Sequence, residues 1–204
     1  GFVINQLSGG GCEHMGNFPT FPVKGKLKMS PDNILNYRIN ISEEKGHAGY
    51  YEAMVQEDIK AKLTVTERTG MASYEYPADQ QYGTVIIGGG ISATPIEQAA
   101  IVITAPNKCE GYAEGGNFCG LRTPYKVYFV AEFDADALES GTWKRDELKP
   151  NTTFAEGEYS GVYFTFDVSK KKNVQYKIGV SYVSVENARE NLKAENTGWD
   201  FLQI

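Results

Sequence analysis

The 204-residue sequence has few of the residue types that build metal centres and disulfide frameworks. It contains two histidines and three cysteines, and an odd number of cysteines cannot form a complete disulfide set. We expect free thiols, with a Cys109–Cys119 pair as the alternative because both lie in one glycine-rich stretch. Cys12 and His14 are not at a zinc-ligand spacing, which argues against a structural zinc site.

Basic charge and long apolar runs are also scarce. The formal net charge is −6, whereas nucleic acids and anionic membranes select for clustered Lys and Arg. A bilayer-spanning helix needs about 20 consecutive apolar residues, and the sequence has no such run. The sequence therefore predicts neither a nucleic-acid partner nor a membrane-spanning segment.

The ends of the chain suggest a piece of a larger protein. The sequence begins Gly1-Phe2-Val3-Ile4, with no initiator Met and no charged leader region. At the other end, the apolar residues of Gly198–Ile204 fit the first turns of a helix that does not finish. We expect both ends to cut through structure and not to lie in linkers.

Aromatic residues and glycine are plentiful, with 13 Tyr, 10 Phe and 22 Gly. Such a composition favours strands joined by turns. Strands are expected at Asn36–Ile41, Gly49–Gln56, Ile59–Thr66, Gly70–Tyr76, Gly83–Ile91, Gln98–Thr104, Lys108–Ala113, Tyr125–Phe133, Gly161–Val168 and Val174–Val183, after an irregular segment over residues 1–30. Ile59–Thr66 alternates apolar and polar residues, and residues 174, 176, 178, 180 and 182 of the last strand share one apolar face.

A helix is expected only near the end of the chain. Val185, Ala188 and Leu192 form an apolar stripe along Val185–Glu195, and Ser184 is a suitable N-cap. Because strands recur at short intervals without intervening helices, the pattern predicts a mostly β, antiparallel β-sandwich with one C-terminal helix. The expected domains are a sandwich over residues 1–184 and a helical linker over residues 185–204.

Several segments carry polar groups, but none forms a complete catalytic set. Gly9–Gly11 and Gly88–Gly90 do not follow a phosphate-binding pattern. A thiol enzyme using Cys12 would need a base and an orienting group, and only His14 is near. Paired carboxylates perform glycoside hydrolysis, but Glu132, Asp134 and Asp136 also fit a solvated strand end.

Two polar loops remain as candidate ligand-binding segments, because loops on rigid sheets often line such sites. The first is the glycine-rich Gly9–Asn17, and the second is Glu110–Cys119, whose acidic, amide and aromatic groups suit a sugar. The candidate substrate-binding residues are Gly10, Cys12, Glu13, His14, Asn17, Glu110, Asn117 and Cys119.

Long blocks of the sequence resemble the N-terminal β-sandwich domain of glycoside hydrolase family 92, a family of exo-acting α-mannosidases. These blocks are NQLSGGGC (Asn5–Cys12), GNFPTFP (Gly16–Pro22), AGYYEAMVQEDIKAKLTVTERTGMASYEYP (Ala48–Pro77), EGYAEGGNFCG (Glu110–Gly120), YKVYFVAEFD (Tyr125–Asp134) and YKIGVSYVSVENARENLKAENTGWDF (Tyr176–Phe201). They occur in family order and cover nearly the whole chain.

The resemblance implies a galactose-mutarotase or supersandwich-like fold whose first strands would precede Gly1, followed by an (α/α)₆ catalytic barrel that this sequence does not contain. It implies inverting, calcium-dependent hydrolysis of an α-mannoside glycan, as in N-glycan processing, with the acid, base and calcium ligands in the barrel. No catalytic residue, metal ligand or cofactor is therefore expected in this chain.

Its loops would shape the leaving-group side of the pocket, and it would dock onto the barrel. A secreted, periplasmic or cell-surface location and a bacterial origin are favoured. The alternative is a free-standing carbohydrate-binding module.

Overall fold

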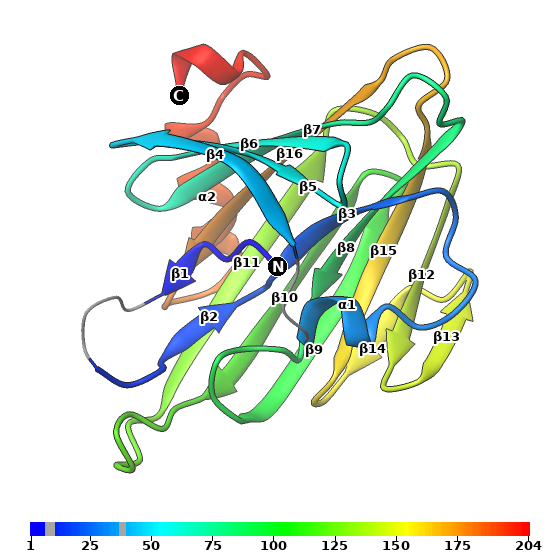
Figure 1. The fold of residues 1–204 in the computed structure, drawn as a ribbon. Helices are drawn as coiled ribbons and strands as arrows, with labels where there is room; N and C mark the ends of the chain where they lie inside the picture. Colours follow the sequence, from blue (N-terminus) through cyan, green and yellow to red (C-terminus); the bar gives the residue numbers. More distant parts are fainter. Residues whose placement is uncertain (7–10, 37–39) are drawn as a thin grey trace.

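The computed structural model describes residues 1–6, 11–36 and 40–204, and its main body is a two-layer sandwich of antiparallel sheets (Figure 1). The larger sheet has nine strands, in the spatial order β14 (Phe154–Glu156), β9 (Ile96–Ala105), β10 (Lys108–Gly115), β11 (Tyr125–Phe133), β16 (Asn173–Ser181), β7 (Thr69–Glu75), β6 (Ile59–Val65), β5 (Tyr50–Val55) and β4 (Ile41–His47). The smaller sheet has the order β13 (Glu147–Pro150), β12 (Glu139–Lys144), β15 (Ser160–Asp167), β8 (Tyr82–Gly88) and β3 (Thr20–Lys24).

Short elements complete the described fold. A two-stranded ribbon joins β1 (Asn5–Gln6) to β2 (Met15–Asn17). The helical elements are α1 (Asp32–Asn36), α2 (Val185–Glu195) and the 3₁₀ turn η1 (Phe201–Gln203). The β-sandwich class and the C-terminal helix predicted from the sequence are confirmed.

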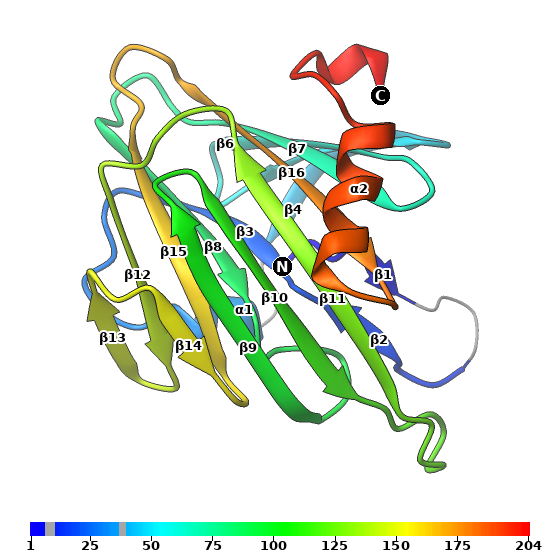
Figure 2. The same ribbon diagram turned by 180° about the vertical axis from the view of Figure 1, so that it is seen from behind.

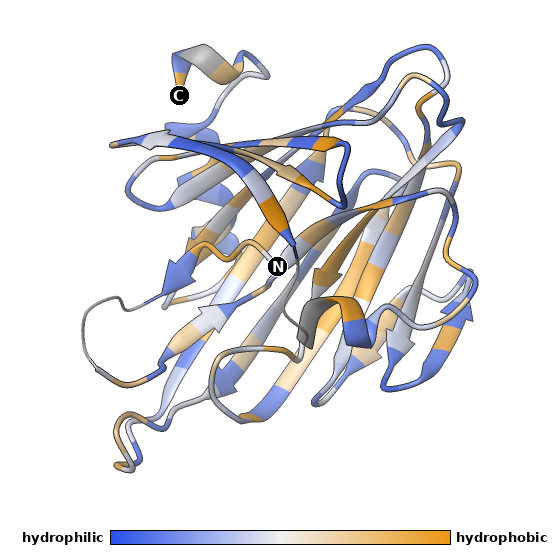
Figure 3. Ribbon diagram, viewed as in Figure 1, coloured by the Kyte–Doolittle hydropathy of each residue, from blue (hydrophilic) through white to orange (hydrophobic). Residues whose placement is uncertain are grey.

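The core lies between the two sheets, where hydrophobic residues follow the central strands (Figure 3). Aromatic rings bridge the layers. Phe18, just before β3, packs on Phe129 of β11 with ring centroids 4.2 Å apart, and Phe133 of β11 packs on Phe164 of β15 at 4.8 Å. All four side chains are almost completely buried. This aromatic core holds the strands that carry the loops at each end of the sandwich.

Helix α2 lies on the outer face of the large sheet, over β11 and β16 (Figure 2). Ala188 and Leu192 pack against Val130, which gives the predicted apolar stripe its partner. Gly179 allows the close approach, because a Cβ at that position would lie 2.5 Å from the Ala188 carbonyl oxygen. The bounds predicted for this helix, Val185–Glu195, are confirmed.

The N-cap of α2 gives a simple test of this local structure. The Ser184 hydroxyl accepts a hydrogen bond of 3.0 Å from the Asn187 N–H. Replacing Ser184 with alanine removes an acceptor for a helix-end donor, so we expect the free energy of unfolding to fall by about 1 kcal/mol in urea denaturation. Ser184→Asp retains the acceptor and should restore most of the loss, whereas equal losses for both variants would contradict the capping role.

Several sequence expectations need correction. Residues 1–30 are not irregular throughout, since they contain β1, β2 and β3. The strand expected over Asn36–Ile41 is wrong at its start, because Asn36 ends α1 and β4 begins at Ile41; residues 37–39 lie outside the described residues. The segment Glu139–Glu156 contains three strands that the sequence did not predict. Tyr182 follows β16 and is 52% exposed, so it does not continue the apolar face of that strand.

Candidate functional site

Two loops with candidate residues meet at one end of the sandwich, where a disulfide joins Cys12 to Cys119. Their Cα atoms are 5.4 Å apart, although 107 positions separate them in sequence. Figure 1 shows the segment before β2 and the connection between β10 and β11 at the same end of the molecule. The disulfide therefore joins two segments that were predicted from the sequence as separate candidate sites.

This pairing corrects both cysteine expectations. Cys12 and Cys119 are not free thiols, and Cys109 does not pair with Cys119. Cys109 lies near the start of β10 and faces the core, whereas Cys119 follows the other end of that strand. Because a strand advances about 3.3 Å per residue, the two sulfurs lie too far apart to bond. Burial raises the pKa of the Cys109 thiol, so this remaining cysteine is an inert core residue.

His14 packs against the loop on the other side of the disulfide and against the start of β11. Its ring centroid is 5.2 Å from that of Phe118 and 5.4 Å from that of Tyr125. The side chain is only 7% exposed, yet its Nδ1 atom has no hydrogen-bond partner among the described residues. A buried polar atom without a partner is costly, and a bound water or ligand is the usual explanation.

Asn17 is the centre of a polar network next to His14. Its Oδ1 atom accepts hydrogen bonds from Asn5 Nδ2 at 3.1 Å and from the Tyr125 hydroxyl at 2.8 Å. Asn5 Nδ2 also contacts the Tyr182 hydroxyl at 3.4 Å. Asn17 is completely buried, but its Nδ2 donor is unpaired within the described structure. Burial raises the pKa of Tyr125, so its hydroxyl stays protonated and donates at neutral pH.

The backbone around this network adopts an unusual conformation. Met15, Gly16 and Phe18 have φ values of 60°, 74° and 55°, and Cys119 across the disulfide has 52°. Non-glycine residues in the left-handed region are uncommon, and they concentrate at functional sites. The backbone geometry thus agrees with the unpaired polar atoms in marking this end of the sandwich.

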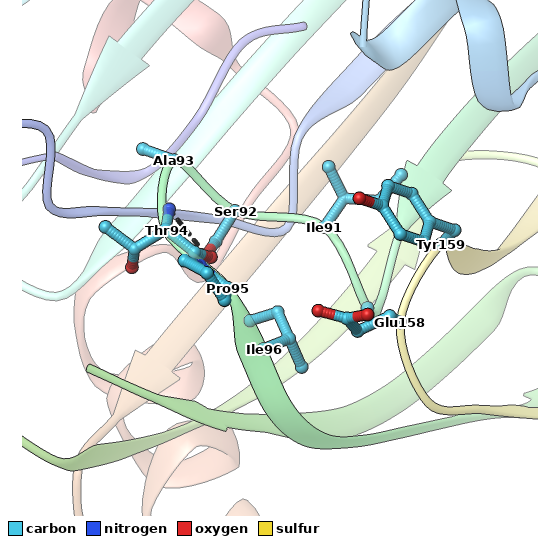
Figure 4. A pocket seen from close by; sticks show the side chains of 9 residues that line it. Ile91, Ser92, Ala93, Thr94, Pro95, Ile96, Glu158 and Tyr159 are labelled. Carbon is cyan, nitrogen blue, oxygen red and sulfur yellow. Dashed lines mark hydrogen bonds between the residues drawn. The ribbon is translucent and has the colours of Figure 1, made fainter. Parts of the chain in front are cut away.

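A pocket of about 250 Å³ lies beside the network, between the Gly90–Ile96 segment and Glu158–Tyr159 (Figure 4). The Ala93 N–H donates to the Met15 carbonyl at 2.8 Å, which ties the pocket wall to β2. In Figure 4 the Glu158 carboxylate points toward Ile96, and the Tyr159 ring lies next to Ile91. A carboxylate and an aromatic ring in one pocket can contact the hydroxyl groups and the apolar face of a sugar, although the Arg145 guanidinium covers one face of the Tyr159 ring at 4.6 Å.

The structure brings together most, but not all, of the predicted site residues. Cys12, His14, Asn17 and Cys119 meet, with Glu13 and Asn117 exposed in the same two loops. Gly10 lies outside the described residues.

The prediction that Glu110 lies in a loop is wrong. It lies within β10 and not in a loop, and it forms an ion pair of 2.6 Å with Arg189 of α2. The alternation of β10 places it on the outer face of the sheet, whereas Cys109 beside it faces the core. The Glu110 carboxylate, which was predicted to bind a sugar, is therefore paired with α2.

Other members of the site were missed by the sequence analysis. Asn5, Tyr125 and Tyr182 come from separate strands or strand ends, and Glu158 and Tyr159 come from the turn before β15. Of these residues, only Asn5 lies close in sequence to the candidate loop Gly9–Asn17. The φ of 55° at Tyr159 marks an unusual turn, but no sequence pattern announces it.

Comparison with known proteins identifies the class of protein. The fold places the chain among antiparallel β-sandwich domains. Residues 1–181 match the family described as the glycosyl hydrolase family 92 N-terminal domain, and the chain belongs to that family.

The relatives agree with this assignment. An uncharacterized secreted glycosidase from Arthroderma benhamiae is 24% identical over 100% of this chain and 30% of its own length. A family GH92 α-mannosidase from Bacteroides thetaiotaomicron is 25% identical, with a TM-score of 0.84, covering 100% of this chain and 29% of that chain. A family GH92 inverting mannosidase of the same species gives 24% and 0.76, over 91% of this chain and 24% of that chain. The chain thus spans less than a third of the length of these relatives.

None of its described helices is long and apolar enough to cross a membrane.

Proposed function

We propose that this chain is the N-terminal, non-catalytic domain of an inverting exo-α-mannosidase, and that its disulfide-linked loops shape the leaving-group side of the pocket. The observation that carries the proposal is the pair of buried, unpaired polar atoms, His14 Nδ1 and Asn17 Nδ2, which lie three residues apart in the segment that the disulfide ties to Cys119. A glycan presents hydroxyl groups that donate and accept hydrogen bonds, and so would satisfy both atoms.

The catalytic acid, the base and the calcium ion belong, in this proposal, to a barrel domain outside this chain. Three or more clustered His, Cys, Asp or Glu side chains that could hold a metal ion do not occur among the described residues. The sandwich would dock onto that barrel and bring its loop end to the substrate. The Cys12–Cys119 disulfide supports a secreted, periplasmic or cell-surface location, because disulfides persist in oxidising compartments.

Replacing His14 with phenylalanine tests the proposed contact. Phenylalanine retains the ring packing on Phe118 and Tyr125 but removes both ring nitrogens. In the longer protein that contains this chain, we expect kcat/KM for an α-mannoside to fall about two- to tenfold, the value of one net hydrogen bond of about 0.5–1.5 kcal/mol. The melting temperature should stay within a few degrees of the unmodified protein.

The other histidine provides a matched control. His47 stacks on Tyr50 with ring centroids 5.2 Å apart and lies on the β4–β5 hairpin, away from the disulfide. His47→Phe should leave kcat/KM unchanged. Equal activities of the His14→Phe and unmodified proteins would contradict the proposed contact, and equal losses in both variants would show that the effect is not specific to the site.

A further inference from the structure

A second polar pocket lies far from the disulfide end, beneath the C-terminal end of α2. It has a volume of about 270 Å³ and is lined by Glu132 of β11, Lys177 of β16 and five residues of the α2 region: Arg189, Leu192, Lys193, Asn196 and Thr197. Three cations and one carboxylate line it, in a chain whose overall charge is −6. The local charge is therefore opposite to that of the protein.

Lys177 is a buried cation that forms no ion pair with the described residues. Its side chain is 7% exposed, its Nζ lies 4.6 Å from the centre of the Trp199 ring, and it makes one hydrogen bond of 3.0 Å, to the Asn196 carbonyl. An ammonium group has three donors, so two remain unused. Of the described carboxylates, none forms an ion pair with it, and burial lowers its pKa. A buried charge is normally paired, which makes this lysine an exception that needs an explanation.

The nearby carboxylates are already engaged by other cations. Glu132 lies opposite Lys177 in the β11–β16 pairing, but it forms an ion pair of 3.1 Å with Lys108. Glu110 is held by Arg189 at 2.6 Å. Glu132 is shared between Lys108 and Lys177, so the positive charge of Lys177 and Lys193 is only partly balanced within the pocket.

Asn196 adds an independent observation. It is completely buried in the wall of this pocket, and neither its Nδ2 donor nor its Oδ1 acceptor has a partner in the described part of the chain. Its backbone N–H caps α2 by donating to the Leu192 carbonyl, and its carbonyl accepts from Lys177, so its side chain takes part in neither contact. A buried amide with both groups unpaired indicates a polar occupant.

We propose that this pocket binds a small tetrahedral oxyanion, a phosphate or sulfate group, with Lys177 as its charged anchor and Asn196 Nδ2 as a second donor. Such a group accepts several hydrogen bonds at once and supplies the missing negative charge. The pocket volume also exceeds the roughly 30 Å³ that one water molecule occupies in the liquid. This site is independent of the proposed sugar contacts, because it shares no residue with them.

Titration of the 204-residue chain with inorganic phosphate and with sulfate, followed by backbone NMR at constant ionic strength set with sodium chloride, tests the proposal. We expect saturable shifts of the Lys177 and Asn196 amide signals with at least one of the two anions. Lys177→Met should weaken binding at least tenfold, and Asn196→Ala provides a second variant if the first does not fold. A hexose 6-phosphate that binds more tightly than phosphate would identify a phosphorylated sugar as the source, whereas equal affinity would indicate the free anion.

Lys126→Met is the matched control. Lys126 is also a strand lysine on this face of the sheet, and its Nζ lies 4.0 Å from the centre of the Tyr112 ring, but it does not line the pocket. This variant should bind the anion as the unmodified chain does. Shifts that do not saturate, that chloride alone produces, or that persist in both pocket variants would overturn the proposal and leave water as the occupant.

Discussion

Replacing both Cys12 and Cys119 with serine is expected to lower the free energy of unfolding by about 4–5 kcal/mol. The disulfide closes a loop with a sequence separation of 107, and the chain-entropy model assigns about 4.7 kcal/mol to a loop of that size. This is a large part of the total stability of a typical domain, which is about 5–15 kcal/mol. Urea denaturation of the two proteins measures the difference as a shift in midpoint.

Reduction of the unmodified chain is the control for this prediction. A reducing agent should lower the unfolding midpoint of the unmodified chain toward that of the serine variant, and should leave the variant unchanged. Cys109 is fully buried, so it should not react with an alkylating agent in either folded protein. A loss of less than about 1 kcal/mol would show that the loops are held mainly by the packing of His14 on Phe118 and Tyr125.

Replacing Trp143 with alanine is expected to cost about 3–5 kcal/mol. Trp143 is completely buried in β12 and lies opposite Gly161 of β15. A Cβ at Gly161 would lie 2.3 Å from the Trp143 ring, so the indole fills the space that this glycine leaves open. Alanine would leave a cavity that the paired strands cannot close without breaking their hydrogen bonds.

Two further variants separate the loss of side-chain volume at Trp143 from the loss of its indole N–H. Trp143→Phe retains much of the ring and removes an indole N–H that has no partner in the described structure, so it should cost less than about 1.5 kcal/mol. Trp199 is the second tryptophan, and it lies half-buried over Lys177 near the end of the chain. Trp199→Ala should be much milder than Trp143→Ala when both are measured by denaturation. A similar cost at both positions would contradict the assignment of Trp143 to the core.

The strands with strong periodic signals could be predicted from the sequence. Tyr125–Phe133 and the helix Val185–Glu195 have the predicted bounds, because apolar periodicity and a serine N-cap are local signals. The strands β12, β13 and β14 escaped prediction because they are short and include glycine, proline and charged residues. β12 and β13 join the smaller sheet beside β15, and β14 pairs with β9 at the edge of the larger sheet; no local pattern encodes these pairings.

The candidate site was predictable only in part. Cys12, His14 and Asn17 are close in sequence and form one polar loop, so they could be chosen together. The partners of this loop could not, since Cys119, Tyr125 and Tyr182 come from residues more than 100 positions away. The disulfide was missed because an odd number of cysteines does not say which pair will meet in the fold. The ion-pair partner of Glu110 could not be predicted, because it depends on where α2 packs.

The central claim is that this chain serves a mannosidase without being a complete catalyst. The most direct test compares the release of mannose from an α-mannoside by the 204-residue chain and by the longer protein that contains it, at equal concentration and with calcium present. The account predicts release by the longer protein and none above the uncatalysed rate by the chain alone. Hydrolysis by the chain alone, or no hydrolysis by the longer protein, would contradict it.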